Sequence, residues 1–330
     1  MLTNYREIFQ NCLPSDRLHY EGEVMEFHSK DETEDLYFKP GIVAEPISTL
    51  EVSALMQLAF EHNVSVTAGG ARTGLSGGAL AIQGGLVLSL RRMNKILLID
   101  EINQQVIVEP GVVTEVLQNA VSEKGLFYAV DPASRGTCSI GGNIAENSGG
   151  PRAVKYGVTK DWVLNLEVVL ADGRVIETGA NTLKNSTGYN LTGLIVGSEG
   201  TLGIVTRATL KLQPLPRFQA LMLVPFTSVT NACKSVSQIF RAGSMPSAIE
   251  FMERDAVVLT QEFTGNKEIS LEPNDQAYLL IEVDGFYESE LMPQCERVLS
   301  VLKANGAGDV LFAQSASEKE KLWYLRQRVG

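Results

Sequence analysis

The stretch AGGARTGLSGG, residues 68–78, constrains the fold more than any other part of the sequence. Gly69, Gly74 and Ser76 follow the outline of a nucleotide P-loop. Leu75, however, stands where that motif needs the lysine that reaches the terminal phosphates. Triphosphate chemistry is therefore not expected at this loop.

The residues after the loop exclude a second familiar site. A dinucleotide fingerprint needs a helix that opens directly from the glycines, because the helix N-terminus receives the pyrophosphate. Here the chain continues ALAIQGGLVLSL, in which Gly84 and Gly85 break any helix and a β-rich run follows. Two interpretations stay open: an anion-binding nest of main-chain N–H groups between strands, or an ordinary glycine-rich turn.

Composition is that of a globular protein with about two domains, since the 330 residues are 44% hydrophobic and 20% charged. A net charge of -11 opposes binding to nucleic acid or to acidic lipid. No stretch has the length and apolarity of a signal peptide or a membrane span. We expect no nucleic-acid partner, no transmembrane segment and a cytoplasmic location, with attachment to the inner membrane through a partner as the alternative.

The cysteines and histidines predict neither disulfides nor a metal site. The four cysteines lie far apart without C-x-x-C spacing, and are Cys12, Cys138, Cys233 and Cys295. The three histidines lack metal-ligand spacing, and are His19, His28 and His62. We expect free thiols, and His62 near the C-terminus of a helix, where it favours the helix dipole.

Hydrophobic periodicity predicts an α/β pattern in the first two thirds of the chain, after a leading helix and loop. Helices are expected over residues 47–63, with Ser48 and Glu51 as a capping box, and over residues 114–124, with Thr114 as the cap. Strands are expected at residues 41–46, 64–68, 86–90, 95–100, 105–110, 162–170 and 174–179.

Residues 131–157 interrupt this pattern. The segment is rich in Gly, Ser, Asn and Pro and is too long for a plain connection, so we expect a functional loop between well-formed strands. A third cluster of small residues, GLIVGSEGTLGIVT, again joins glycines to a strand. Three such loops spread over some 130 residues are what a large, extended ligand requires.

A second domain is expected beyond Pro214 and Pro216, because neither proline continues a central strand. Strands and helices then alternate, which predicts a small α+β domain with helices on one face of an antiparallel sheet. Its expected strands are 220–226, 247–251 and 277–285, and its expected helices are 228–243, 289–306 and 318–330.

In this order, the motifs AGGARTGLSGG, DPASRGTCSIGGNIAENSGGPRAVKYG and VGSEGTLGIVT resemble the FAD-binding domain of vanillyl-alcohol-oxidase type flavoproteins. The resemblance is to the branch with D-lactate dehydrogenase, D-2-hydroxyglutarate dehydrogenase and a subunit of glycolate oxidase. It implies an α+β fold: an N-terminal lead segment (1–39), a two-subdomain FAD-binding PCMH-type domain (40–214) and a partial ferredoxin-like α+β cap domain (215–330).

The resemblance also implies which residues contact FAD. The first loop holds the pyrophosphate through main-chain N–H groups, which need small side chains and no lysine, at Gly69, Gly70, Ala71, Arg72, Thr73 and Gly74, with Leu75 and Ser76 behind them. The second follows the flavin ring and ribityl chain at Pro132, Ser134, Thr137, Ser139, Gly142, Asn143, Asn147 and Gly157. Near the adenosine or the loop base lie Glu199, Gly200, Gly203 and Ile204. We interpret Gly149 and Gly150 as turn formers.

Attachment of FAD is expected to be noncovalent, since the first loop has neither the histidine nor the cysteine that relatives use. Cys138, in the second loop, is interpreted as a buried small hydrophobe. Arg326 in LWYLRQR matches the carboxylate-binding arginine of the family, with an exposed helical arginine as the alternative. Trp323 is expected to pack in the core.

The sequence departs from the family after this point. Relatives carry a pair of metal-binding histidines and an active-site His or Glu, but no histidine follows His62. The chain is interpreted either as a fragment of a longer protein or as a short subunit. A divalent metal is therefore implied for full-length relatives, and its ligands are not expected here.

The resemblance implies FAD-dependent oxidation of a D-2-hydroxy acid such as D-lactate, glycolate or 2-hydroxyglutarate to the 2-oxo acid. Electrons would pass to a quinone, an electron-transfer flavoprotein or another non-NAD acceptor, and the chain would be a homodimer or part of an oxidase complex. Three alternatives stay open: a noncatalytic FAD-holding or electron-transfer subunit, a flavoenzyme of the same fold with other chemistry such as ether-lipid synthesis, and a nucleotide-binding protein without redox function.

Overall fold

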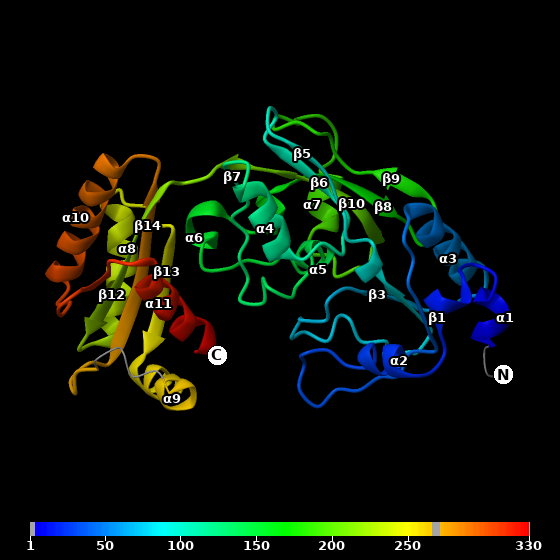
Figure 1. The fold of residues 1–330 in the computed structure, drawn as a ribbon, viewed down its shortest axis with the longest axis horizontal. Helices are drawn as coiled ribbons and strands as arrows, with labels where there is room; N and C mark the ends of the chain where they lie inside the picture. Colours follow the sequence, from blue (N-terminus) through cyan, green and yellow to red (C-terminus); the bar gives the residue numbers. More distant parts are fainter. Residues whose placement is uncertain (1–3, 266–270, 330) are drawn as a thin grey trace. The chain divides into compact units, whose positions relative to one another are not determined.

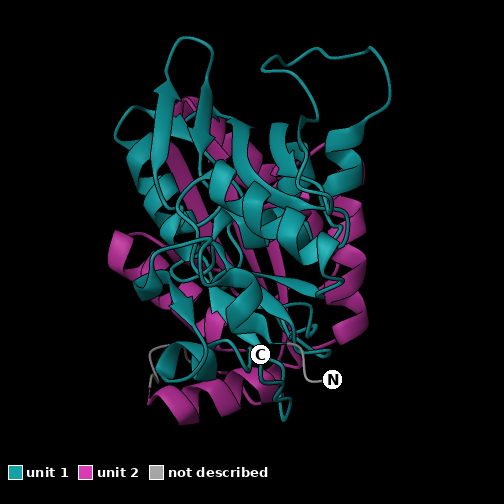
Figure 2. Cartoon of the chain, turned by 90° about the vertical axis from the view of Figure 1, so that its right-hand side faces the viewer, with its two compact units in different colours: residues 1–149, 158–214 teal, residues 150–157, 215–330 magenta. Residues whose placement is uncertain are grey.

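The computed structural model describes residues 4–265 and 271–329, which form two compact units (Figures 1 and 2). The first unit contains residues up to 149 and 158–214, and the second contains residues 150–157 and everything after Pro214. The second unit thus begins after Pro214, and it also includes one short segment from the second glycine-rich region. The lead segment packs as part of the first unit.

The first unit contains a four-stranded sheet in the order β1-β2-β4-β3 and a five-stranded antiparallel sheet in the order β5-β6-β10-β8-β9. Its strands are β1 (Leu18–His19), β2 (Ile42–Ala44), β3 (Val66–Gly69), β4 (Leu86–Ser89), β5 (Ile96–Asp100), β6 (Gln105–Val108), β7 (Leu126–Phe127), β8 (Val163–Val169), β9 (Val175–Glu177), β10 (Ile204–Lys211) and β11 (Gln213–Pro214). Its helices are α1 (Tyr5–Phe9), η1 (Ser15–Arg17), α2 (Glu23–Phe27), α3 (Thr49–Glu61), η2 (Leu90–Arg92), α4 (Thr114–Ser122), α5 (Ile140–Glu146), η3 (Thr159–Asp161) and α7 (Leu191–Ile195).

Helix α3 and the parallel strands around it form the main core of this unit. Val52, Leu55 and Ala59 recur at helical spacing and are fully buried, together with Ile42 and Leu86 from β2 and β4. Because β3 pairs in parallel with β4, the chain must leave β3 through a crossover, and the glycine-rich loop lies at the start of that connection. The core thus fixes the strand end from which the loop departs.

The helices and strands expected from periodicity in this unit are confirmed, but their caps differ. Ser48 caps α3 by accepting from the Glu51 N–H, whereas the Glu51 carboxylate accepts from Ile47 and binds Arg17 instead of closing a capping box. Val113, not Thr114, is the N-cap residue of α4. The Thr114 hydroxyl faces the segment that leads into α5.

Residues 131–157 are not wholly a loop, which corrects the expectation from composition. Ser139 caps α5 by accepting from the Gly142 N–H, and Ile140 and Ile144 are buried, so tertiary packing outweighs the low helix propensity of the glycines. Helix α5 ends at Asn147, which adopts a left-handed conformation with φ 49°. A further short helix, α6 (Ala153–Tyr156), follows.

The second unit is a four-stranded antiparallel sheet in the order β13-β14-β12-β15. In chain order this is the 2-3-1-4 arrangement of a ferredoxin-like β-α-β-β-α-β fold, as expected. Besides α6, its elements are β12 (Phe218–Phe226), α8 (Val229–Arg241), β13 (Ala248–Glu253), α9 (Arg254–Thr264), β14 (Ala277–Gly285), α10 (Glu288–Ala304), β15 (Leu311–Ala313) and α11 (Ala316–Arg328).

Helices cover both faces of this sheet, whereas the sequence predicted helices on one face. Ile281 on β14 packs in the cluster that contains Cys295 of α10, while Leu280 packs in the cluster that contains Leu322 of α11. Adjacent strand residues point to opposite faces, so β14 is buried from both sides. The face with α9 and α11 was not predicted because those helices are polar in composition. Within the described ranges, no helix is long and apolar enough to cross a bilayer.

Candidate functional site

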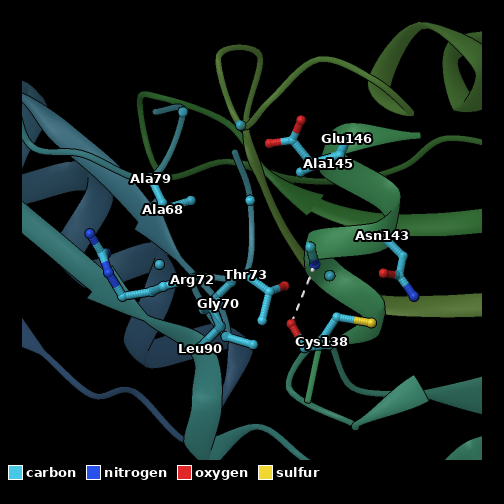
Figure 3. A pocket seen from close by; sticks show the side chains of 18 of the residues that line it. Ala68, Gly70, Arg72, Thr73, Ala79, Leu90, Cys138, Asn143, Ala145 and Glu146 are labelled. Carbon is cyan, nitrogen blue, oxygen red and sulfur yellow. Dashed lines mark hydrogen bonds between the residues drawn. The ribbon is translucent and has the colours of Figure 1, made fainter. Parts of the chain in front are cut away.

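A cavity lies in the first unit between the loop after β3 and helix α5. Figure 3 shows Gly70, Arg72 and Thr73 on one side of it and Cys138, Asn143 and Glu146 on the other. These two walls come from the first and second glycine-rich regions of the sequence. The third region contributes Glu199 and Gly200.

The loop after β3 presents main-chain N–H groups to this cavity. None of the N–H groups of residues 71–75 donates a hydrogen bond to another described residue. Small residues also let the walls approach each other, because a Cβ on Gly70 would lie 3.0 Å from Ser139 Oγ. The loop is therefore an array of free donors with little side-chain cover, which suits an anion.

Helix α5 and α4 fix the opposite wall. The Asn143 side chain is buried and donates through Nδ2 to Thr114 Oγ1 at 2.6 Å. The Thr114 N–H in turn donates to the Cys138 carbonyl at 3.0 Å, and Cys138 is 4% exposed. Cys138 thus lies in the wall as a small buried side chain, in agreement with its interpretation.

Carboxylates line another part of the cavity. Glu146 and Glu199 both approach Gly78, where an added Cβ would lie 3.4 Å from Glu146 Oε1 and 3.0 Å from Glu199 Oε2. Partial burial, followed by the neighbouring Glu199 carboxylate, raises the pKa of Glu146 above its ordinary value. Two carboxylates at this position favour groups that donate hydrogen bonds.

The N-terminal segment supplies a third wall, which the sequence did not predict. Arg72 is 6% exposed and donates through Nε to the Lys30 carbonyl and through Nη1 to His28 Nδ1 at 3.4 Å. Burial and the nearby guanidinium of Arg72 lower the pKa of His28 to about 3, so the ring is neutral and accepts this hydrogen bond. Asp31 lines the same cavity.

Twelve of the twenty predicted FAD-contacting residues line this cavity: Gly69, Gly70, Ala71, Arg72, Thr73, Gly74, Ser134, Ser139, Gly142, Asn143, Glu199 and Gly200. The others do not line it: Leu75, Ser76, Pro132, Thr137, Asn147, Gly157, Gly203 and Ile204. Residues in the lining that sequence reasoning missed include Asp31, Gly78, Pro110, Gly141, Glu146 and Ser148. Gly78 and Gly141 stood inside the quoted motifs and were available to it.

Several of the residues outside the cavity have local structural roles. Asn147 Oδ1 accepts from the Lys160 N–H at 2.9 Å, which holds the end of α5. A Cβ on Gly203 would lie 2.6 Å from Val168 Cγ1, so this glycine allows β10 and β8 to pack closely. Gly157 belongs to the segment that packs with the second unit. Their predicted contacts with FAD stay predictions.

Arg326 lies in the second unit on α11, where its Nε forms an ion pair with Glu250 of β13. The side chain is 31% exposed, and its Nη groups donate to no other described residue. Trp323 is partly buried and packs against the core cluster that contains Leu322, as expected, and its Nε1 donates to Glu282 at 3.3 Å. Arg326 is thus oriented by a carboxylate while its terminal nitrogens are available.

Comparison with known proteins identifies the family. Residues 40–179 match the family described as FAD binding domain, and residues 215–329 match the family described as FAD linked oxidases, C-terminal domain. The chain is 36% identical over 320 residues to a D-2-hydroxyglutarate dehydrogenase of Xanthomonas citri pv. viticola. The alignment covers 97% of this chain and 67% of that protein. The chain belongs to the FAD-linked oxidase family.

Two further relatives are named for the oxidation of hydroxy acids. The glycolate oxidase subunit GlcD of Bacillus subtilis is 41% identical over 300 residues, and a D-lactate dehydrogenase of Anaerostipes hadrus is 40% identical over 291 residues. The matches cover 91% and 87% of this chain, but 62% and 61% of those proteins. The chain therefore spans less than two thirds of their length. An alkyldihydroxyacetonephosphate synthase structure has the same fold, with a TM-score of 0.82, 22% identity and coverage of 99% of this chain and 63% of that one.

The residues of the cavity fit FAD. A dinucleotide pyrophosphate needs several N–H donors and close access of the backbone, and residues 71–75 offer free donors beside glycines that leave room. Arg72 adds a buried positive charge to the same wall. The family assignment identifies FAD as the cofactor, and this donor set is compatible with its pyrophosphate.

Proposed function

We propose that this chain is the FAD-binding part of an enzyme that oxidises a D-2-hydroxy acid, such as D-lactate, glycolate or D-2-hydroxyglutarate, to the 2-oxo acid. The observation that carries the proposal is the loop of unpaired N–H groups at residues 71–75 in a chain of the FAD-linked oxidase family. Relatives named as D-lactate dehydrogenase, D-2-hydroxyglutarate dehydrogenase and a subunit of glycolate oxidase support this substrate class.

FAD, when bound, supplies the two-electron acceptor that takes the hydride from C2 of the hydroxy acid. The cavity residues hold the cofactor without a covalent bond, since the loop at residues 68–78 contains neither Cys nor His. Cys138 is buried and its Sγ lies 3.3 Å from Thr114 Oγ1, so it serves as a packing group in this proposal. Electrons then leave to a non-NAD acceptor.

Arg326 binds the substrate carboxylate in this proposal. Its Nε is held by Glu250, and the two Nη groups are left to form the bidentate pair that a guanidinium makes with a carboxylate. A fixed anchor for the carboxylate orients the substrate, and orientation is a large part of the rate enhancement in a bimolecular hydride transfer. Arg326 therefore acts by positioning the acid.

A second candidate function is a noncatalytic FAD-holding subunit of an oxidase complex. Three relatives are named as subunits of glycolate oxidase, which favours this candidate. It predicts bound FAD without reduction by any hydroxy acid. The described residues contain no group of three His, Cys, Asp or Glu side chains suited to a metal ion, so neither candidate assigns a divalent metal to them.

The test is an absorbance spectrum of the purified protein before and after acid precipitation, followed by anaerobic titration with D-lactate, glycolate and D-2-hydroxyglutarate. The proposal expects FAD that acid releases and bleaching by at least one of these acids, with L-lactate as the control. Arg326→Lys should raise the concentration of acid needed for half-maximal bleaching at least tenfold. Arg328→Lys, at an exposed position of the same helix, should leave this concentration unchanged. A protein that binds no FAD would contradict the proposal. Bound FAD that none of the hydroxy acids bleaches would favour the noncatalytic candidate.

A further inference from the structure

The loop after β3 contains one residue that is out of place in a run of small residues. Arg72 has φ 64°, a left-handed conformation in which a residue with a Cβ is strained and glycine is not. It is also almost fully buried. A strained, buried arginine in the middle of a glycine-rich loop requires a compensating role for its side chain.

The hydrogen bonds of Arg72 are incomplete. Its Nε and Nη1 are bonded to Lys30 and His28, which fix the guanidinium, but Nη2 is buried without a partner. Burial lowers the pKa of this guanidinium below its ordinary value, as expected for an incompletely compensated charge. Figure 3 shows the side chain directed away from Cys138 and Asn143, so it serves a different end of the cavity from α5.

Two further buried atoms without partners lie in the N-terminal segment that holds Arg72. They are Asp31 Oδ2 and Thr33 Oγ1, and Asp31 lines the cavity together with Arg72. Asp31 is near enough for its charge to stabilise the guanidinium, yet no hydrogen bond or ion pair joins the two side chains. Buried polar groups of folded proteins are normally paired, so Arg72 and Asp31, which line the same cavity, call for a ligand there.

The chemistry of these two cavity-lining atoms limits the kind of ligand that fits. Arg72 Nη2 is a positively charged donor and needs an anionic oxygen, whereas Asp31 Oδ2 is an acceptor and needs a hydroxyl or amino group. Among the described residues that line the cavity, Arg72 is the one cation, beside the carboxylates of Asp31, Glu146 and Glu199. A ligand with a phosphate and hydroxyl groups a few ångströms apart satisfies both, and a nucleoside diphosphate has this pattern.

We infer that the side chains of Arg72 and Asp31 recognise the ADP half of FAD, with Arg72 Nη2 donating to the pyrophosphate and Asp31 Oδ2 accepting from a hydroxyl of the ribose. The inference rests on the proposed function for the identity of the ligand. His28 and the Lys30 carbonyl are positioning groups, because they aim the guanidinium and do not face the ligand. Thr33 supplies a further donor or acceptor beside Asp31.

The experiment compares FAD, ADP and riboflavin as probes of the full chain. Dissociation constants are measured by flavin fluorescence for FAD and riboflavin, and by displacement of FAD for ADP. Arg72→Gly and Asp31→Asn should each raise the dissociation constants of FAD and ADP at least tenfold. The dissociation constant of riboflavin should stay within twofold of the wild-type value. Arg72→Gly keeps every main-chain N–H of the loop and removes the strain at φ 64°, but it also removes the contacts with Lys30 and His28. An unchanged dissociation constant for riboflavin therefore shows that the rest of the cavity is intact.

Gln104→Gly is the matched control, because Gln104 is an exposed residue with φ 52° outside the cavity. It should stabilise the fold to a similar degree and change no dissociation constant. Wild-type protein that binds FAD, with both variants binding FAD and ADP within twofold of it, overturns this inference and leaves the proposed function standing. Wild-type protein that binds no FAD overturns both. An equal rise in the dissociation constant of riboflavin also overturns the inference, since it shows that the whole cavity is disrupted.

Discussion

The cavity wall of the first unit and strand β14 of the second unit both bury charged side chains, but only the carboxylates of β14 are paired within the described residues. Arg72 Nη2 and Asp31 Oδ2 are buried without partners. Glu282 and Asp284 on β14 are each 2% exposed, and both have several partners. The carboxylates of β14 thus find their partners within the chain, whereas the two cavity atoms have none.

In the second unit, the partners of the buried carboxylates come from the segment 150–157 and from α11. Glu282 accepts from Arg152 Nε at 3.2 Å and from Ser247 Oγ at 3.0 Å. Asp284 binds Lys155 and accepts from the Tyr156 hydroxyl at 2.6 Å. Burying a carboxylate is costly unless it is paired and hydrogen-bonded, so these residues explain why this segment packs with the second unit.

This comparison distinguishes a structural polar cluster from a ligand site. A buried charge that has all its partners rigidifies the fold, whereas one without partners destabilises the ligand-free protein and gains its partners on binding. Removing a partner in the second unit should therefore lower the unfolding free energy. Removing an unpaired group in the cavity should raise the unfolding free energy of the ligand-free protein.

The largest effect is expected for Lys155→Met, which leaves the buried carboxylate of Asp284 without its cation. Breaking a buried ion pair from one side costs about 3–5 kcal/mol of unfolding free energy. Urea denaturation, with hydrogen exchange of the β14 amides to localise the loss, measures it. The double variant Lys155→Met, Asp284→Asn should recover most of the stability, and a loss below about 1 kcal/mol in the single variant would contradict the pairing argument.

The pH dependence tests the His28 contact in the first unit. The pKa of His28 is about 3 in the fold, against 6.5 for an ordinary histidine, because of burial and then Arg72, Arg91 and His19. The unfolded chain therefore binds more protons between pH 6.5 and 3, and the unfolding free energy falls as the pH falls through this window. The contribution at pH 5 should be about 2 kcal/mol lower than at pH 7.

Denaturation curves of the wild type and of His28→Gln at both pH values give the measurement. The variant should lose most of the slope between pH 7 and pH 5, because the side chain that takes up the proton on unfolding is gone. His62→Gln is the matched control, since His62 is exposed at the C-terminal end of α3. Equal slopes in wild type and His28→Gln would show that the imidazole is not held neutral.

The sequence predicted the parts of the site that have a local signal. The loop at residues 68–78 was recognisable because glycines mark close approach and unusual backbone angles. Helix α5 was missed because Gly141 and Gly142 lower its propensity, and its stability comes from burial of Ile140 and Ile144. Propensity was overridden by tertiary packing, which a local pattern does not contain.

Long-range contacts account for the remaining differences. Asp31 and His28 meet Arg72 across more than 40 residues, and Arg152 meets Glu282 across 130 residues. Nothing in the neighbourhood of these residues indicates a partner, so the third wall of the cavity and the membership of segment 150–157 were not predicted. For the same reason, the sequence indicated Arg326 as an anchor and gave no sign of Glu250.

The smallest effect is expected for a threonine-to-valine substitution, which should change the unfolding free energy in opposite directions at Thr33 and at Thr206. Thr33 Oγ1 is buried without a partner, so Thr33→Val removes an unsatisfied group and should raise the unfolding free energy of the ligand-free protein by about 1 kcal/mol. Thr206 Oγ1 donates to Glu167 Oε1 at 2.8 Å, so Thr206→Val should lower it by about 1–2 kcal/mol. Thermal denaturation without FAD compares the two. With FAD present, the gain at Thr33 should vanish, because the hydroxyl then has a partner to lose; a Thr33→Val variant that is destabilised without FAD would show that the cavity wall is already satisfied.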